Sequence, residues 1–106
     1  MSIHLSALMR LEEVQRGLRR RCVELGLTES QARVLLCLSG LEPLSPGRIA
    51  ARTALNPSSV TGIVDALEAR SFVVRTRDPD NRRRRPLLLT AEGREIQASL
   101  IDALGL

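Results

Sequence analysis

Two short segments of this chain repeat the same helix-start signal, and their spacing limits the folds open to it. Ser45-Pro46 and Asn56-Pro57 each place a capping side chain directly before a proline, which suits the first position of a helix. The first helix would run from Pro46 to about Ala54, and the second would begin at Pro57 after roughly three residues. Two helices joined this closely predict a helix-turn-helix.

The second of these helices, expected over residues 57–70, separates apolar from polar side chains. Its apolar residues recur at steps of three and four and predict a buried stripe. Small polar residues near its N-terminus could reach base edges or phosphates, and a length of roughly 20 Å fits a DNA major groove. Alone, this pattern would be read as a plain surface helix. We expect DNA contacts from Ser58, Ser59, Thr61, Gly62 and Asp65.

A basic hairpin follows this helix. Residues 72–77 begin with β-forming side chains, residues 78–81 have turn chemistry, and residues 86–89 read as a returning edge strand. Four consecutive arginines in the loop repel one another, and a polyanion would relieve that repulsion. We favour nucleic acid over a merely solvated charge run. The expected contacts are Arg75, Arg77, Arg82, Arg83, Arg84 and Arg85.

Further helices flank this region. Residues 3–25 and 91–106 each predict an amphipathic helix, and Gly17 inside the first could mark a close approach to another backbone. A capping box beginning at Thr28 predicts one more helix, and residues 41–44 could add a short strand to the hairpin. The fold expected is a mainly α, single winged helix-turn-helix domain over residues 1–106, with residues 28–90 as the DNA-binding core.

Composition narrows the class of function. All sixteen positive side chains are arginine, against twelve acidic residues, so the net charge is +4. Arginine suits phosphates and guanine edges, although a GC-rich genome would also favour it. The single aromatic residue, Phe72, disfavours stacking on single-stranded bases. We expect no enzyme, metal or cofactor, because no catalytic set, metal cluster or phosphate-binding glycine loop is evident.

The cysteines and the apolar runs fit a cytoplasmic protein. Cys22 and Cys37 fall on apolar helix faces, where a role as buried filler is favoured over redox sensing. The longest apolar run is too short to span a bilayer, and the N-terminus lacks a signal-peptide pattern. We therefore expect a cytoplasmic location without membrane contact.

Taken together, these motifs resemble those of the MarR family, bacterial winged-helix regulators of stress, drug and aromatic-compound responses. The similarity covers roughly Leu27 to Gly93, and its wing block with the closing Leu-Thr is the most specific part. The motifs are Leu27-Thr28-x-x-Gln31, Leu44-Ser45-Pro46-x-x-Ile49-Ala50, Ser58-Ser59-Val60-Thr61, Val64-Asp65-x-Leu67-Glu68, Asp78-Pro79-Asp80-x-Arg82-Arg83 and Leu89-Thr90-x-x-Gly93.

The resemblance implies an obligate dimer that binds double-stranded DNA at a pseudo-palindromic site. Helix 57–70 would enter the major groove and wing 78–86 the minor groove, with Asp80 orienting the inserted Arg82. The family usually represses transcription until a small, often phenolic, ligand binds near the dimerisation helices. The departures are Gly62 where an arginine is common, Ser71 for the usual glycine, and only the first portion of the C-terminal helices, which would leave that ligand pocket incomplete.

Two functions remain in competition. The leading hypothesis is a homodimeric transcriptional repressor. The alternative is a winged-helix interaction module that pairs with a longer partner and binds DNA weakly or not at all, suggested by Gly62, Ala66 and the short C-terminus. Dimerisation would use Leu11, Val14, Leu18, Ile96, Leu100, Ile101 and Leu104.

Overall fold

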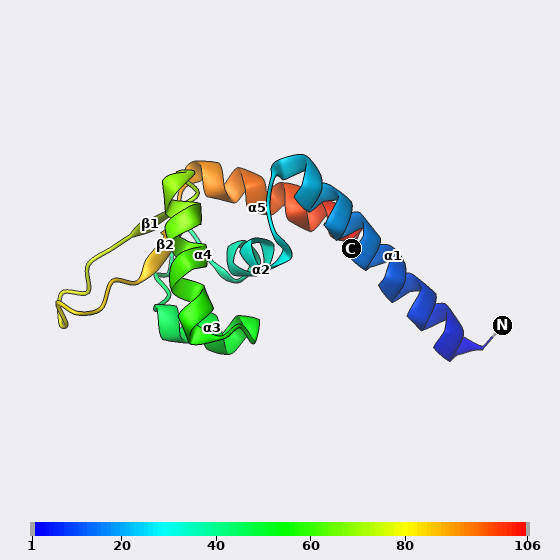
Figure 1. The fold of residues 1–106 in the computed structure, drawn as a ribbon, viewed down its shortest axis with the longest axis horizontal. Helices are drawn as coiled ribbons and strands as arrows, with labels where there is room; N and C mark the ends of the chain where they lie inside the picture. Colours follow the sequence, from blue (N-terminus) through cyan, green and yellow to red (C-terminus); the bar gives the residue numbers. More distant parts are fainter. Residues whose placement is uncertain (1, 106) are drawn as a thin grey trace.

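The computed structural model describes residues 2–105 and shows the expected mainly helical, winged architecture (Figure 1). Helices α2, α3 and α4 and the hairpin β1–β2 gather at one end, and α5 leads from the hairpin to α1, whose N-terminal half projects away. None of these helices combines the length and apolar content needed to cross a bilayer. The elements are α1 Ile3–Leu25, α2 Glu29–Cys37, α3 Pro46–Thr53, α4 Pro57–Ala69, β1 Val73–Arg75, β2 Leu87–Leu89 and α5 Ala91–Leu104.

Local capping starts the helices where the sequence predicts. The Ser45 hydroxyl accepts the Arg48 N–H at 3.3 Å, and the Asn56 side chain accepts the Ser58 N–H at 3.0 Å. Helices α3 and α4 each end one residue earlier than expected. Helix α3 stops because Ala54 adopts a left-handed conformation, with φ of 59°, which cannot continue a right-handed helix.

The hairpin is shorter than the sequence suggested, and the expected extra strand is reduced to a single bridge. Val73 pairs with Leu89 and Arg75 with Leu87 in antiparallel register. Leu44 donates to the Leu87 carbonyl at 3.0 Å and accepts from its N–H at 2.8 Å. This bridge ties the connector before α3 to β2, so the helix-turn-helix and the wing share one frame.

One apolar core joins the helices to the hairpin. Its fully buried members come from every element around it except α1 and β1, and include Leu35, Leu67 and Leu87. Leu100 of α5 also has no exposed surface. The sequence predicts Leu100 at a dimer interface, but its side chain faces the protomer's own core. The apolar residues of α5 do not all face the same way, because α5 packs against both α1 and α2.

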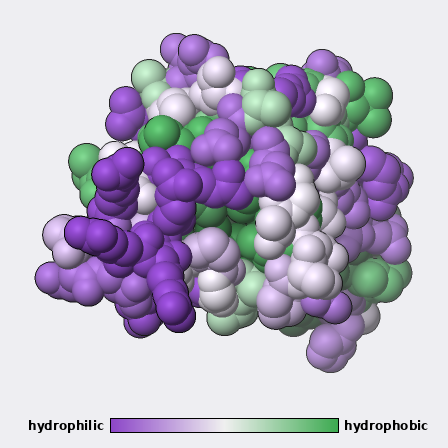
Figure 2. Space-filling model, turned by 60° about the vertical axis from the view of Figure 1, so that its left-hand side comes forward, coloured by the Kyte–Doolittle hydropathy of each residue, from purple (hydrophilic) through white to green (hydrophobic). Residues whose placement is uncertain are grey.

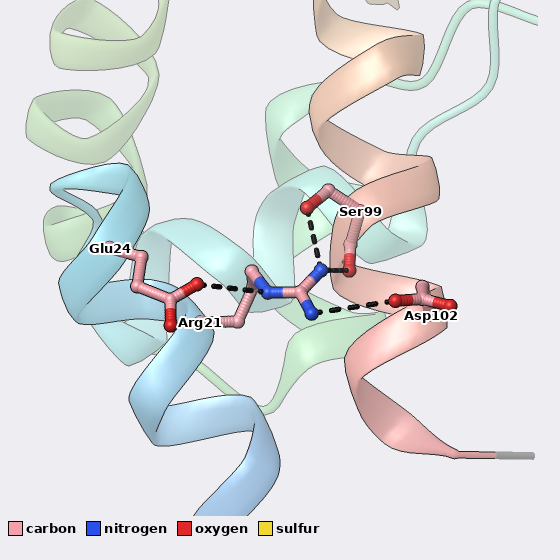
Figure 3. A network of polar contacts seen from close by, with 4 residues as sticks. All are labelled: Arg21, Glu24, Ser99 and Asp102. Carbon is pink, nitrogen blue, oxygen red and sulfur yellow. Dashed lines mark hydrogen bonds and ion pairs between the residues drawn. The ribbon is translucent and has the colours of Figure 1, made fainter.

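Helices α1 and α5 pack closely along the second half of α1. A Cβ added at Gly17 would lie 2.7 Å from the Ala103 carbonyl oxygen, so the predicted close backbone approach is confirmed. Arg21 donates to the Ser99 carbonyl at 2.8 Å and to its hydroxyl at 2.9 Å, and it pairs with Asp102 and Glu24 (Figure 3). This clamp fixes α5 against α1.

Both cysteines behave as packing residues in the described chain. Cys22 is buried, Cys37 is half-buried, and neither forms a disulfide. Burial raises the pKa of both thiols, which keeps them protonated at neutral pH. This environment fits the interpretation of the two cysteines as small apolar fillers.

Ser71, directly after α4, adopts a left-handed backbone with φ of 65°. A side chain is strained there, and glycine is not. We expect Ser71→Gly to raise the free energy of unfolding by about 1 kcal/mol, as measured by urea denaturation. Ser59→Gly is the matched control, because Ser59 is helical and the same change should be destabilising there. A loss of stability in both variants would contradict the strain at Ser71.

Candidate nucleic-acid interface

The N-terminal half of α4 presents a polar face to solvent. Ser58, Ser59, Thr61 and Gly62 are exposed, while Val60, on the other side of the helix, is buried. The Ser58 hydroxyl donates to the Asn56 side chain at 2.8 Å, so it belongs to the helix cap. Within residues 2–105 no side-chain hydrogen bond engages Ser59 or Thr61. Their hydroxyls, beside the N-terminal end of the helix dipole, are therefore available to an anionic ligand.

Gly62 leaves an open surface in the middle of this face. A Cβ built there meets no atom within 4 Å. The flat patch lets a partner approach the α4 backbone closely, but it supplies no side chain that could reach a base. A base contact from this part of α4, as the sequence predicts, would therefore have to come from the neighbouring hydroxyls.

The tip of the hairpin is held by hydrogen bonds between residues that are close in the sequence. The Asp78 carboxylate accepts the Asp80 N–H at 2.9 Å, and the Asn81 side chain accepts the Arg83 N–H at 3.0 Å. A further turn closes where Arg84 donates its N–H to the Asn81 carbonyl at 3.1 Å. These bonds hold the irregular loop in place although the pairing of β1 with β2 does not extend into it.

The wing arginines extend from this loop into solvent. All four residues from Arg82 to Arg85 are exposed, and none forms an ion pair within the described chain. Asp80 and Arg82 form no ion pair with each other within the described chain, and the predicted orienting of Arg82 by Asp80 stays a prediction. Figure 2 turns the wing side forward and shows hydrophilic residues gathered over it. The result is a dense positive charge with no internal counterion.

Two residues predicted to contact DNA, Arg75 and Asp65, form an ion pair with each other in the free protomer. Arg75 Nη2 lies 2.7 Å from Asp65 Oδ1, and Arg75 Nη1 lies 2.5 Å from Glu68 Oε1. The hydrogen bond that Arg75 donates to Asp65, together with the Glu68 charge, raises the pKa of Arg75. The pair forms because β1 packs beside α4 and turns the guanidinium towards it, and the DNA contact predicted for Arg75 and Asp65 stays a prediction.

Sequence reasoning also missed Arg48 and Arg70. Arg48 of α3 lines a hollow of about 340 Å³ together with Arg77 and Arg84, so it adds charge beside the wing. Its place in the first helix of a helix-turn-helix, which crosses the DNA backbone, was the available signal. Arg70 donates to the carbonyls of Leu25 and Gly26, both at 2.9 Å, and so joins the end of α4 to the end of α1.

The sequence pattern of one family covers most of the segment that builds this face. The MarR family model matches residues 27–84, which is more than half of the chain. The chain belongs to the MarR family. Its matched segment contains α2, α3, α4, β1 and most of the wing.

Curated relatives of this MarR-family chain are named as transcriptional regulators rather than enzymes. It is 32% identical to the regulator SarZ of Staphylococcus epidermidis over 79 residues, covering 74% of the chain and 53% of SarZ. It is 33% identical to the repressor MdtR of Bacillus subtilis over 91 residues, covering 86% of the chain and 59% of MdtR. The chain thus spans little more than half the length of these relatives.

Solved structures agree on the winged-helix fold. YusO of Bacillus subtilis superposes with a TM-score of 0.79 at 29% identity, over 97% of this MarR-family chain and 73% of YusO. A mutant of S. aureus MepR bound to an oligodeoxyribonucleotide gives a TM-score of 0.83, over 99% of this chain and 78% of MepR. The MepR match has 19% identity and shows the fold alone.

Proposed function

We propose that this MarR-family chain binds duplex DNA as a homodimer and represses transcription. Helix α4 would enter the major groove, and wing 78–86 the adjacent minor groove, at each half of a pseudo-palindromic operator. The observation that carries this proposal is the pairing of an open polar face on α4 with a wing whose arginines lack internal partners. Helix dipole, hydroxyls and arginines are the groups that duplex DNA recognition uses.

Exposed apolar side chains on α1 and α5 support dimerisation. Leu11 of α1 is 54% exposed and Ile101 of α5 is 49% exposed, and exposed apolar surface of this kind is typical of interaction sites. Val14 and Leu104 border one hollow where the end of α5 meets α1. Leu18 and Ile96 are partly covered by the protomer's own core and would contribute less. A second copy packed on this surface would bring two wings to one duplex.

The competing function is an interaction module that pairs with a longer family member. The exposed first half of α1 favours it, since Ile3 is 84% exposed and the relatives carry additional chain. Such a module would use the same apolar surface but would not need a DNA-binding homodimer. The two functions therefore differ in the mass of the species that binds DNA.

Sedimentation equilibrium with and without duplex DNA from upstream of the gene tests this proposal. We expect twice the protomer mass of 11.7 kDa in the free protein, and a dimer-on-DNA mass once the duplex is added. The complex should weaken steeply as salt rises, because the wing arginines displace counterions from phosphates. A monomer that ignores the duplex would contradict the proposal and favour the heterodimeric module.

A further inference from the structure

Arg75 occupies the seam between the recognition helix and the wing. Its side chain leaves β1 and reaches across to α4, where its two terminal nitrogens lie 2.7 Å from Asp65 and 2.5 Å from Glu68. Only a quarter of the Arg75 side chain is exposed, whereas the two carboxylates are 59% and 40% exposed. Both terminal nitrogens of the guanidinium group thus donate to a carboxylate inside the protomer.

The two carboxylates lie on the helix stripe that carries the DNA-facing hydroxyls. Ser58, Thr61 and Asp65 follow one another at steps of three and four, and Glu68 continues the same row. A carboxylate on this row would repel a DNA phosphate approaching the helix. The guanidinium of Arg75 lies beside both carboxylates and offsets their negative charge. The two carboxylates raise the pKa of Arg75, so it stays protonated.

We propose that Arg75 is a positioning residue for DNA binding, which holds Asp65 and Glu68 and screens them from DNA phosphates. This inference rests on the proposed function and gives Arg75 a different role from the free wing arginines. If Arg75 contacted a phosphate, it would have to leave both carboxylates. Replacing Arg75 would then remove one contact that releases counterions from the DNA.

The two roles predict opposite coupling between Arg75 and the carboxylates. If Arg75 screens them, neutralising Asp65 and Glu68 should matter little while Arg75 is present and should help DNA binding once it is gone. If Arg75 contacts phosphate, the same neutralisation should release it and help most while it is present. The sign of the coupling therefore decides between the roles.

The experiment is a mutant cycle read by fluorescence anisotropy on the upstream duplex. The variants are Arg75→Met, the Asp65→Asn/Glu68→Gln pair, and the triple combination. We expect Arg75→Met to weaken binding about tenfold, the scale of one charged contact at an interface, and the triple variant to recover most of that loss. Arg77→Met, alone and combined with the Asp65→Asn/Glu68→Gln pair, is the matched control, because Arg77 is exposed and has no ion pair in the described chain.

The outcomes separate the two proposals. The positioning role is supported if neutralising the two carboxylates restores duplex affinity to Arg75→Met but does not restore it to Arg77→Met. Suppose the wild-type chain binds the duplex, and the Asp65→Asn/Glu68→Gln pair strengthens binding more when Arg75 is present than when it is replaced. That result overturns the positioning role and leaves the proposed function standing. A wild-type chain that binds no duplex overturns the proposed function, and the positioning role with it. Lasting weakness of the triple variant would also overturn the screening role.

Discussion

Gly93→Ala is expected to lower the free energy of unfolding by about 3 kcal/mol, the upper range for forcing atoms into a packed site. A Cβ at Gly93 would clash with the Phe72 carbonyl oxygen and lie 2.9 Å from the carbonyl carbon. Neither side can give way easily. The Phe72 carbonyl accepts the Thr90 N–H at 3.1 Å, and the Gly93 N–H is held by the Thr90 hydroxyl at 2.9 Å.

Urea denaturation of Gly93→Ala beside Gly62→Ala measures this effect. Gly62 is also helical, but its Cβ would enter open space, so alanine should stabilise α4 by about 1 kcal/mol through helix propensity. The two variants thus add the same methyl group with opposite expected signs. If Gly93→Ala unfolded at the wild-type urea concentration, the junction between the hairpin and α5 would be looser than its contacts indicate.

Arg82→Ala should weaken operator binding about tenfold to a hundredfold, the range for losing an arginine that reaches into a groove. Arg82 stands exposed at the wing tip and has no internal ion pair to replace in the described chain. Its charge is therefore fully available to the duplex. Because it lies on the surface, its removal should leave the unfolding free energy nearly unchanged.

Arg16→Ala provides the control for this loss. Arg16 carries the same charge on an exposed part of α1, away from the wing. Titrations of both variants at several salt concentrations would separate a local contact from a change in net charge. Equal weakening by the two substitutions would contradict the placement of the wing in the minor groove.

The helix boundaries could be predicted because their causes are local. Thr28, Ser45, Asn56 and Thr90 each accept a backbone N–H from two or three residues along the chain. Such a bond depends on the nearby sequence alone, so a cap followed by proline or by a periodic apolar run locates a helix start. The left-handed positions at Ala54 and Ser71 lack this signal, because neither residue type favours them.

The pairing of Arg75 could not be predicted in the same way. Its partners are 7 and 10 residues away and lie on another element, so the contact exists only once β1 has packed beside α4. The burial of Leu100 has the same origin. The apolar stripe of α5 was recognised, but which of its members face the core depends on the angle at which α5 crosses α2 and α1.

The projecting half of α1 affects how a protomer diffuses. A body measuring 56 × 24 × 23 Å experiences more frictional drag than a sphere of equal mass. One protomer should therefore elute early from a size-exclusion column and tumble anisotropically, as a heavier particle would. Association through α1 would enclose the protrusion. Dimerisation should therefore change the elution volume less than it would for a compact protein of the same mass.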